Sequence, residues 1–484
     1  MKALNWLLLV IFVLLNTNIK SQTFEKIIRT PYDDFSFDAV EMANGCFIIA
    51  YSRGNYGQNT ISGLMKLDGN GNLIDSVFFT DYPEYVELGI TDIFPYLNET
   101  LLCVRTAVII ENNRQTVNLI QVTSDLQIVY DTIYGSNEYS GSVYGRTLTD
   151  DNKLVTVGAI DDSRGNLFIG EFDLTSKTYR DNIISGFPAV VSSTVMEIPE
   201  NNVYHMYLYW DNNKTFLVIN KETLNVDTFF YYPELFLPRN SFKGLTDTSY
   251  FAVGTEHILD NSNYAPAFIE VNTEGQIVNH FVDLDYSDTS VFYTYNSFDH
   301  KFGMIYFGLT FNFLTNQPFP FASQPTWIII YKLTPDGSIV WQRFYKGEVN
   351  YNPYKVLATN DGGALITSTK YDWNDPLGQH LDLHILKIDS TGWYEGLPPV
   401  GTDEYSGMKQ ILVYPNPAKD QVHFEPGLYT DLELQIFNQT GILLLAKPLH
   451  SHQTVDVSGY ETGVYIYVIQ NKNGFLEKGK LVKE

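Results

Sequence analysis

The sequence predicts an all-β protein: a seven-bladed β-propeller closed by its own N-terminal strand, followed by a small C-terminal β-sandwich. Three observations support this prediction. Tyr and Phe are abundant, with 34 and 31 copies, whereas charged residues make up only 18% of the chain. Helical periodicity is absent, and β-branched residues, Ser, Thr, Asn and Gly dominate, which favours strands. A strand–turn–strand unit also recurs through the central region.

The recurring unit consists of an apolar strand, a polar turn and a second strand, as at residues 64–74 and 330–339. The first turn residue falls at positions 68, 123, 173, 220, 272, 334 and 389, with spacings of 47 to 62 residues. A further turn-led strand precedes each copy, as at residues 44–50. Each unit therefore has four strands in about fifty residues, which is typical of a propeller blade. Seven units predict seven blades.

The two ends of this region predict how the ring closes. Six units continue into a strand after the turn, as at residues 339–345, whereas the seventh ends at 392–396 and enters a connector. Residues 24–29 offer a strand at the other end of the region. If this strand joins the last blade, the ring closes and both sheet edges are covered, as edge protection favours. The WD-repeat signature is absent, and no blade motif indicates a named propeller family.

The N-terminus predicts export. Lys2 precedes an apolar run over residues 6–15, and Ser21 is a small residue at the boundary, which is typical of a secretory signal peptide over 1–21. The run is too short for a bilayer, which needs about 20 apolar residues. No Cys follows, so no lipid anchor is indicated. We expect no transmembrane segment in the mature chain.

The last eighty residues contain an ordered set of short elements. Residues 414–417 read Tyr-Pro-Asn-Pro, Gly441 ends a turn, and residues 463–465 read Gly-Val-Tyr. Short alternating runs separated by turns, as at 432–436, predict a β-sandwich of about seven strands. An accessory binding module of the same shape is the alternative. The order of the elements resembles the type A C-terminal sorting domain of type IX (Por) secretion cargo in Bacteroidetes-type bacteria. The residues that carry this resemblance are Tyr414, Pro415, Asn416, Pro417, Gly441, Gly463 and Tyr465.

The resemblance implies that type IX secretion machinery recognises residues 409–484. It also implies a protein that is secreted or held at the outer-membrane surface of a Gram-negative bacterium. In that family the domain is commonly removed and the cargo attached to surface lipopolysaccharide. Cleavage would then fall in the connector, taken as residues 398–408, and the propeller would span 22–397. The resemblance covers about a sixth of the chain and gives no chemistry for the rest.

Charge and cysteine content exclude several classes of function. The net charge is −25, with +2 in residues 1–21 and −1 in 405–484, so the central region carries −26. Nucleic acids and anionic membranes are polyanions and are excluded as partners. Cys46 and Cys103 are the two cysteines, which excludes a disulfide scaffold. Both lie in apolar runs, and we expect buried free thiols.

One face of the predicted propeller carries long loops. The links between the second and third strands of a blade, and between successive blades, are long. They lie on the face opposite the short turns. Long loops on a rigid scaffold commonly bind ligands. Their aromatic, Asp and Asn side chains suit stacking on sugars and accepting hydrogen bonds from hydroxyls. The alternative is that these aromatics are buried against neighbours or cover the channel mouth. The candidate binding residues are Trp210, Asp211, Tyr264, Phe319, Phe321, Asp372 and Trp373.

Catalytic and metal-binding signatures are absent, so no cofactor or metal is predicted. Residues 68–72 resemble a calcium loop, but Leu73 stands where Gly is required, and a hairpin turn is the better interpretation. His380 and His384 lie too far apart along a strand, about 13 Å, to share one ion. Acidic residues are numerous, so a carboxylate pair like that of a glycosidase stays an alternative, although no spacing selects one. The hypotheses are a non-catalytic glycan- or protein-binding protein, an extracellular hydrolase or lyase with acidic residues at the channel mouth, and a structural spacer.

Overall fold

The fold is taken from a computed structural model of the chain. It describes residues 22–54, 60–79, 85–109, 114–134, 143–160, 166–187, 192–198, 201–210, 213–232, 236–246, 249–257, 264–274, 276–283, 292–311, 325–345, 347–375, 380–394, 412–414, 416–425, 432–438, 441–449, 453–471 and 474–484. The predicted signal peptide lies outside these ranges. The chain forms two compact units, Met1–Gly396 and Leu397–Glu484. Within the described ranges, no helix is long and apolar enough to cross a membrane.

The first unit is built from antiparallel sheets that we number in chain order. The first sheet holds β2(Asp33–Phe35), β3(Ala39–Glu41), β4(Phe47–Gly54), β5(Thr60–Leu67) and β6(Leu73–Phe79). The second holds β7(Tyr85–Tyr96), β8(Thr100–Ile109), β9(Arg114–Val122) and β10(Ile128–Tyr134), with the short 3-10 helix η1(Leu97–Glu99) between β7 and β8. The third holds β11(Val143–Leu148), β12(Lys153–Ala159), β13(Asn166–Asp173) and β14(Thr178–Ser185). The fourth holds β15(Ser192–Ile198), β16(Val203–Trp210), β17(Asn213–Asn220) and β18(Val226–Tyr232).

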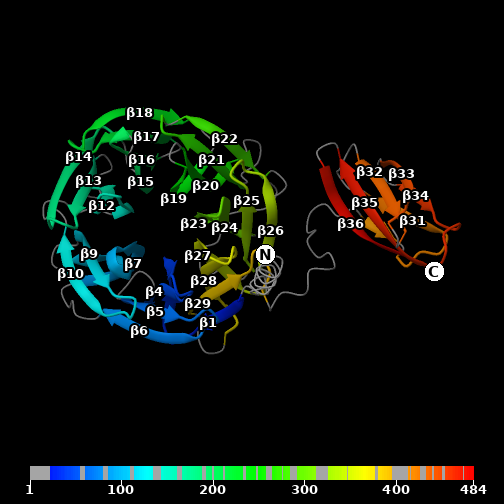
Figure 1. The fold of residues 1–484 in the computed structure, drawn as a ribbon, viewed down its shortest axis with the longest axis horizontal. Helices are drawn as coiled ribbons and strands as arrows, with labels where there is room; N and C mark the ends of the chain where they lie inside the picture. The colour runs from blue at the N-terminus through cyan, green and yellow to red at the C-terminus, as the bar shows by residue number, and fades with distance from the viewer. Residues whose placement is uncertain are drawn as a thin grey trace, which may run out of the picture. The chain divides into compact units, whose positions relative to one another are not determined.

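The remaining sheets of this unit follow the same order. The fifth holds β19(Phe236–Thr246), β20(Ser249–His257), β21(Tyr264–Asn272) and β22(Ile277–Val282). The sixth holds β23(Phe292–Lys301), β24(Met304–Phe311), β25(Trp327–Leu333) and β26(Ile339–Tyr345). The seventh holds β27(Asn350–Ala358), β28(Ala364–Tyr371), β29(Leu381–Ile388) and, beside β29, the N-terminal strand β1(Phe24–Ile28). Figure 1 shows these sheets arranged radially in chain order, a propeller-like fold with β7, β15 and β19 near the axis and β10, β14 and β18 at the rim.

The hydrophobic cores lie between neighbouring sheets. The third and fourth sheets share one core that includes Ile169 and Leu217, both fully buried. The seventh sheet packs against the first in the same way, with Leu383 and Ile49 in a common core. Strands covered on both faces need apolar side chains at consecutive positions, which explains the continuous apolar runs of the repeat.

The N-terminal strand pairs with the seventh sheet, as the sequence predicts. β1 runs antiparallel to β29, with Phe24 opposite Lys387 and Ile28 opposite Leu383. Arg29 then binds two carboxylates of the same sheet, with its nitrogens 2.8 Å from Asp382 and 2.9 Å from Asp375. Main-chain pairing and ion pairs thus hold together segments more than 350 residues apart in sequence.

The first residue of each repeat turn caps that turn with its own side chain. Asp68 Oδ1 accepts the backbone N–H groups of Asn70 and Asn72 at 2.9 and 2.8 Å. Residues 68–72 therefore form a self-capped hairpin turn. A side chain that satisfies the turn amides makes the turn compact, which is why Asp, Asn and Thr recur at this position. The same role is taken by Thr123, Asp173, Asn220, Asn272, Thr334 and Asp389.

The two cysteines are free, but only one is buried. Cys103 is fully buried in β8, in the core between the first and second sheets, and burial raises the pKa of its thiol. Cys46 is only partly buried, so the expectation of two buried thiols is wrong for it. It immediately precedes β4, at the end of a turn in which Ala43 and Asn44 are exposed.

The second unit consists of short strands that form two sheets. One contains β30(Leu412–Tyr414), β31(Gln421–Glu425) and β34(Gln453–Asp456). The other contains β32(Leu432–Phe437), β33(Leu443–Leu449), β35(Gly463–Asn471) and β36(Gly474–Lys483). Phe424 and Ile436 are fully buried in a core to which both sheets contribute, which is the arrangement of a sandwich.

Replacing Arg29 with Ala should weaken the attachment of β1. Loss of the guanidinium leaves the nearly buried Asp382 carboxylate without its ion-pair partner, so we expect the free energy of unfolding to fall by about 1–2 kcal/mol at pH 7. Thermal unfolding of the mature protein, followed by circular dichroism, measures this. Lys26→Ala, in the same strand, is the matched control. An equal effect of both substitutions would contradict a specific role for Arg29.

Candidate functional site

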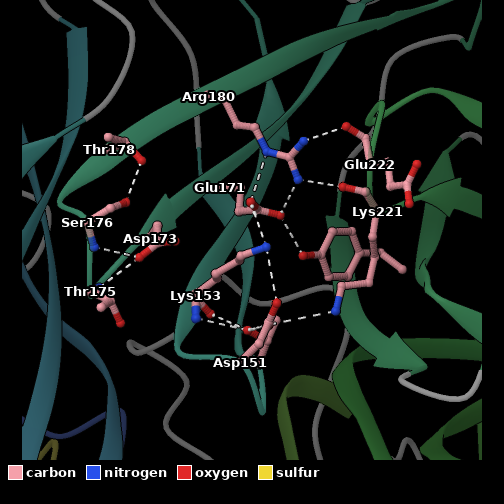
Figure 2. Close-up of polar contacts among 12 residues, drawn as sticks. Asp151, Lys153, Glu171, Asp173, Thr175, Ser176, Thr178, Arg180, Lys221 and Glu222 are labelled. Carbon is pink, nitrogen blue, oxygen red and sulfur yellow. Dashed lines mark hydrogen bonds and ion pairs between the residues drawn. The ribbon is translucent and has the colours of Figure 1, made fainter.

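Within the described ranges, an extensive network of ionisable side chains joins the third and fourth sheets (Figure 2). Glu171, on β13, accepts two hydrogen bonds from Arg180, on β14: Nε donates to Oε1 and Nη2 to Oε2, both at 2.9 Å. The hydroxyl of Tyr204, on β16, donates to Glu171 Oε2 at 2.7 Å. Arg180 also donates to the main-chain carbonyls of Lys221 and Glu222, in the turn of the next sheet. One carboxylate therefore orients a guanidinium that spans two sheets.

Further ion pairs extend this network. Lys153 Nζ lies 3.1 Å from Asp151 and 3.4 Å from Glu171, and Lys221 pairs with Glu197. Three cations thus face three carboxylates, which leaves the group electrically balanced. Burial opposes ionisation of Glu171, but hydrogen bonds from Arg180 and Tyr204 outweigh it and hold its pKa below 4.5. A balanced network of this kind stabilises the contact between the two sheets.

The same type of contact recurs between other neighbouring sheets. Lys66 Nζ donates to the carbonyl of Ser124 at 2.8 Å, and Lys332 Nζ donates to the carbonyl of Ser390 at 3.0 Å. Like Lys221, these acceptors directly follow the first residue of a repeat turn. We call this contact, from a cation of one sheet to the turn carbonyl of the next, the turn clamp. Turn clamps join neighbouring sheets on the face that carries the short turns.

A second ionisable group lies on the innermost strands. Lys355 Nζ, on β27, is 2.5 Å from Asp38, whose Oδ2 accepts the backbone N–H of Ile93 at 2.7 Å. Asp299, on β23, accepts the N–H of Ala358 at 3.0 Å. Burial disfavours the charged amine of Lys355, but the Asp38 and Asp299 carboxylates outweigh it and raise its pKa. Both carboxylates are therefore engaged in joining neighbouring inner strands.

A serine, a histidine and a glutamate form a hydrogen-bonded chain across the seventh sheet. Ser368 Oγ lies 2.6 Å from His384 Nδ1, and His384 Nε2 lies 2.9 Å from Glu25 Oε1. The three residues come from β28, β29 and β1, so sequence spacing gave no sign of them. Although these residue types occur in hydrolases, Ser368 is fully buried, and the ring of Tyr351 packs 5.0 Å from the His384 ring. No substrate carbonyl can approach this hydroxyl, and the chain instead fastens β1.

The predicted loop residues lie in several sheets and are not gathered into one cluster. Trp210 ends β16, Tyr264 begins β21, and Asp372 with Trp373 directly follows β28. Each therefore stands at the link from second to third strand of its own sheet. The link after Trp210 consists only of residues 211–212, so the prediction of a long link is wrong for the fourth sheet. Asp372 Oδ1 accepts the N–H of Asn374 at 2.9 Å, which shapes the start of that link. Asp211, Phe319 and Phe321 lie outside the described residues.

The residues of the predicted sorting motif have structural roles in the second unit. Asn416 follows β30, accepts the N–H of Val482 at 2.9 Å and donates to the carbonyl of Lys480 at 2.7 Å. The Tyr465 hydroxyl donates to the carbonyl of Glu461 at 2.7 Å. Gly441 adopts a φ of 81° in the turn before β33, a conformation that favours glycine. Tyr414 ends β30, Pro417 follows Asn416 and Gly463 begins β35, while Pro415 lies outside the described residues.

The charged residues of the turn clamps were missed at the sequence level, although a signal for them exists. Lys66, Glu171 and Lys332 each stand two residues before the first residue of a repeat turn, inside an apolar strand. A charge at a fixed position of an otherwise apolar strand indicates a buried polar contact. Among the described residues, no group of three His, Cys, Asp or Glu could hold a metal ion.

Comparisons with known proteins identify the second unit. Residues 412–484 match the family model described as a secretion system C-terminal sorting domain. The protein is therefore cargo of type IX secretion, which its sorting domain engages, and it is secreted or held at the surface of a Gram-negative cell. No curated protein matches the chain.

Among solved structures, the chain is similar to a propeller and to other proteins at low identity. The Dos1 propeller is 9% identical over 73% of this chain and 77% of that chain, with a TM-score of 0.39. A protein of unknown function from Dyadobacter fermentans is 9% identical over 75% and 98%, with a TM-score of 0.44. The WD40 domain of Toxoplasma gondii coronin is 10% identical over 78% and 88%, with a TM-score of 0.41.

Replacing Arg180 with Ala should destabilise the contact between the third and fourth sheets. The Glu171 carboxylate is nearly buried, whereas Arg180 is partly exposed, so we expect the free energy of unfolding to fall by about 1–3 kcal/mol at pH 7. The folded-state pKa of Glu171 is lowered, so its contribution is complete above the unfolded pKa, about 4.3, and is lost as the pH falls. Urea unfolding at pH 7 and pH 3.5 should show a smaller difference between the two proteins at the lower pH. A difference that does not depend on pH would show that the ionised Glu171 is not the partner.

The hydrogen-bonded chain of Ser368, His384 and Glu25 should be chemically silent toward serine-directed reagents. Because Ser368 is fully buried, a fluorophosphonate probe should leave the native mature protein unlabelled, as measured by intact-protein mass spectrometry. A known serine hydrolase labelled in parallel serves as the positive control. Labelling that disappears in Ser368→Ala would show an accessible nucleophile.

Proposed function

We propose that residues 22–397 form a closed seven-bladed propeller that acts as a non-catalytic binding protein for glycans or extracellular proteins. In this proposal residues 1–21 are the signal peptide, 398–408 a linker and 409–484 the sorting domain. Support for ring closure comes from the pairing of β1 with β29 and from the core shared by the seventh and first sheets. The added strand gives the last sheet four strands like its neighbours, and radial repetition of such sheets leaves only short, protected edges.

The observation that carries the binding role is the difference between the two faces of the propeller. On one face, short turns are capped by their own first residues and joined by turn clamps such as that of Lys66. On the other face, the second and third strands of the fifth and seventh sheets end at longer links, marked by Tyr264 and Trp373, whereas in the fourth sheet only residues 211–212 separate Trp210 from β17. Variable links on a rigid frame are where binding residues commonly lie. We propose Trp210, Asp211, Tyr264, Phe319, Phe321, Asp372 and Trp373 as contact residues of this face.

An extracellular hydrolase or lyase with acidic residues at the channel mouth is the alternative function, and the inner-strand group would have to supply its carboxylates. Asp38, Asp92, Asp299 and Lys355 all belong to the inner part of their sheets. Asp38 and Asp299 accept backbone N–H groups, and Asp92 lies 3.1 Å from Arg146. Carboxylates engaged in this way are poorly placed to exchange a proton with a substrate, which supports binding over catalysis.

Replacing Trp210 and Trp373 with Ala should weaken ligand binding without unfolding the protein. We expect each substitution to reduce affinity at least about tenfold for ligands found with the mature protein on a glycan array and an extracellular-protein array. Phe302→Ala is the matched control, since Phe302 is 70% exposed in a short turn on the opposite face. Binding that survives both Trp substitutions would reject the long-link face. Turnover of an aryl glycoside or polysaccharide that is abolished by Asp92→Asn would support the hydrolase, and absence of both binding and turnover would support a spacer.

A further inference from the structure

A lateral groove separates the rim strands of the third and fourth sheets. It is lined by residues 182–187, at the end of β14, and by residues 225–229, in β18. Its volume is about 600 Å³, within the range of sites that hold small molecules. It lies between rim strands, and at Gly186 and Phe187 it reaches the link from the third to the fourth sheet; none of the contact residues proposed above lines it.

Side-chain contacts fix the two walls of the groove relative to each other. Asn182 Nδ2 donates to the carbonyl of Leu224 and to Asn225 Oδ1, both at 3.0 Å. Ile184 is buried in the core that the third and fourth sheets share. One side of the groove continues into the network of Figure 2, where Arg180 binds the carbonyls of Lys221 and Glu222. A groove with fixed walls binds a ligand with a small ordering cost.

The lining combines an apolar platform with uncharged polar groups. Phe229 is 46% exposed, and its ring meets that of Phe187 edge-on, with centroids 5.8 Å apart and planes at 85°. Around this platform stand the amide of Asn225 and the hydroxyls of Ser185 and Thr228. The side-chain oxygen of Asn225 accepts the hydrogen bond from Asn182. Among the described residues, the NH₂ group of Asn225 has no hydrogen-bond acceptor. Asp227 is the one ionisable side chain in the lining, and no cation is among the lining residues.

We propose that this groove binds a neutral oligosaccharide. A sugar ring has an apolar face, which suits the exposed ring of Phe229, and a rim of hydroxyls, which suits Asn225, Ser185 and Thr228. An anionic ligand would meet no cation in the groove, and the net charge of −25 would repel it. The inference does not depend on ligand binding by the long-link face.

The test uses the mature protein and a panel of neutral hexasaccharides: cellohexaose, xylohexaose, mannohexaose and maltohexaose, with hexagalacturonate as the charged probe. Isothermal titration calorimetry should detect binding of at least one neutral hexasaccharide and none of hexagalacturonate. Phe229→Ala should weaken binding at least about tenfold, because the platform is lost. Asn225→Asp retains the acceptor for Asn182 but loses the NH₂ donor, and should weaken binding about three- to tenfold.

Matched variants separate this site from the long-link face and from loss of folding. Phe302→Ala removes an exposed Phe elsewhere and should leave the hexasaccharide affinity unchanged, whereas Trp373→Ala reports on the long-link face. All four variants should keep the circular dichroism spectrum of the parent protein. No binding of any neutral hexasaccharide, or affinity unchanged by Phe229→Ala, would overturn the proposal. Binding lost in Trp373→Ala but kept in Phe229→Ala would assign the sugar to the other face. An extended peptide that displaces the bound hexasaccharide and binds more tightly would identify a peptide groove.

Discussion

The turn clamp is the interaction on which the arrangement of the sheets depends. A β-sheet stabilises itself along its hydrogen bonds, but apolar packing between two sheets allows many relative positions. A directional bond from a cation such as Lys66 or Lys332 to one turn carbonyl selects a single position. Between the third and fourth sheets, Glu171 occupies the position of these lysines, and Arg180 supplies the cation that it lacks. The contact is thus kept although the sign of the charge at that position is reversed.

This arrangement divides the molecule into surfaces with different uses. The face of the short turns is committed to internal bonds, because its turn amides and carbonyls already have partners. The inner strands are joined by carboxylates, as Asp38 is to Ile93. The rim carries the exposed ring of Phe229 with amide and hydroxyl groups beside it, and the long-link face carries Trp373. Export by type IX secretion places these two surfaces outside the cell, where ligands would meet them.

Several functional arguments depended on neighbours that the sequence does not reveal. Ser368, His384 and Glu25 meet only because β1 joins a strand more than 350 residues away, and burial then removes the hydroxyl from any substrate. Cys46 and Cys103 look alike in sequence, yet one is partly exposed and the other fully buried. In the sorting domain, Asn416 and Tyr465 read as a recognition motif, whereas their contacts show that they also hold the sandwich together.

By itself, the sequence determined the strand content, the recurring turns and the nature of the sorting domain. These follow from local causes: alternating and continuous apolar runs, turn residues that cap their own backbone, and an ordered motif. The pairing of β1 with β29 could also be predicted, because an unpaired strand at each end implies a partner. Which charged residues meet, which serine is buried and where the groove between β14 and β18 opens were decided by tertiary structure alone. Contacts between sheets depend on the position of one whole sheet relative to the next, and no local pattern encodes that position.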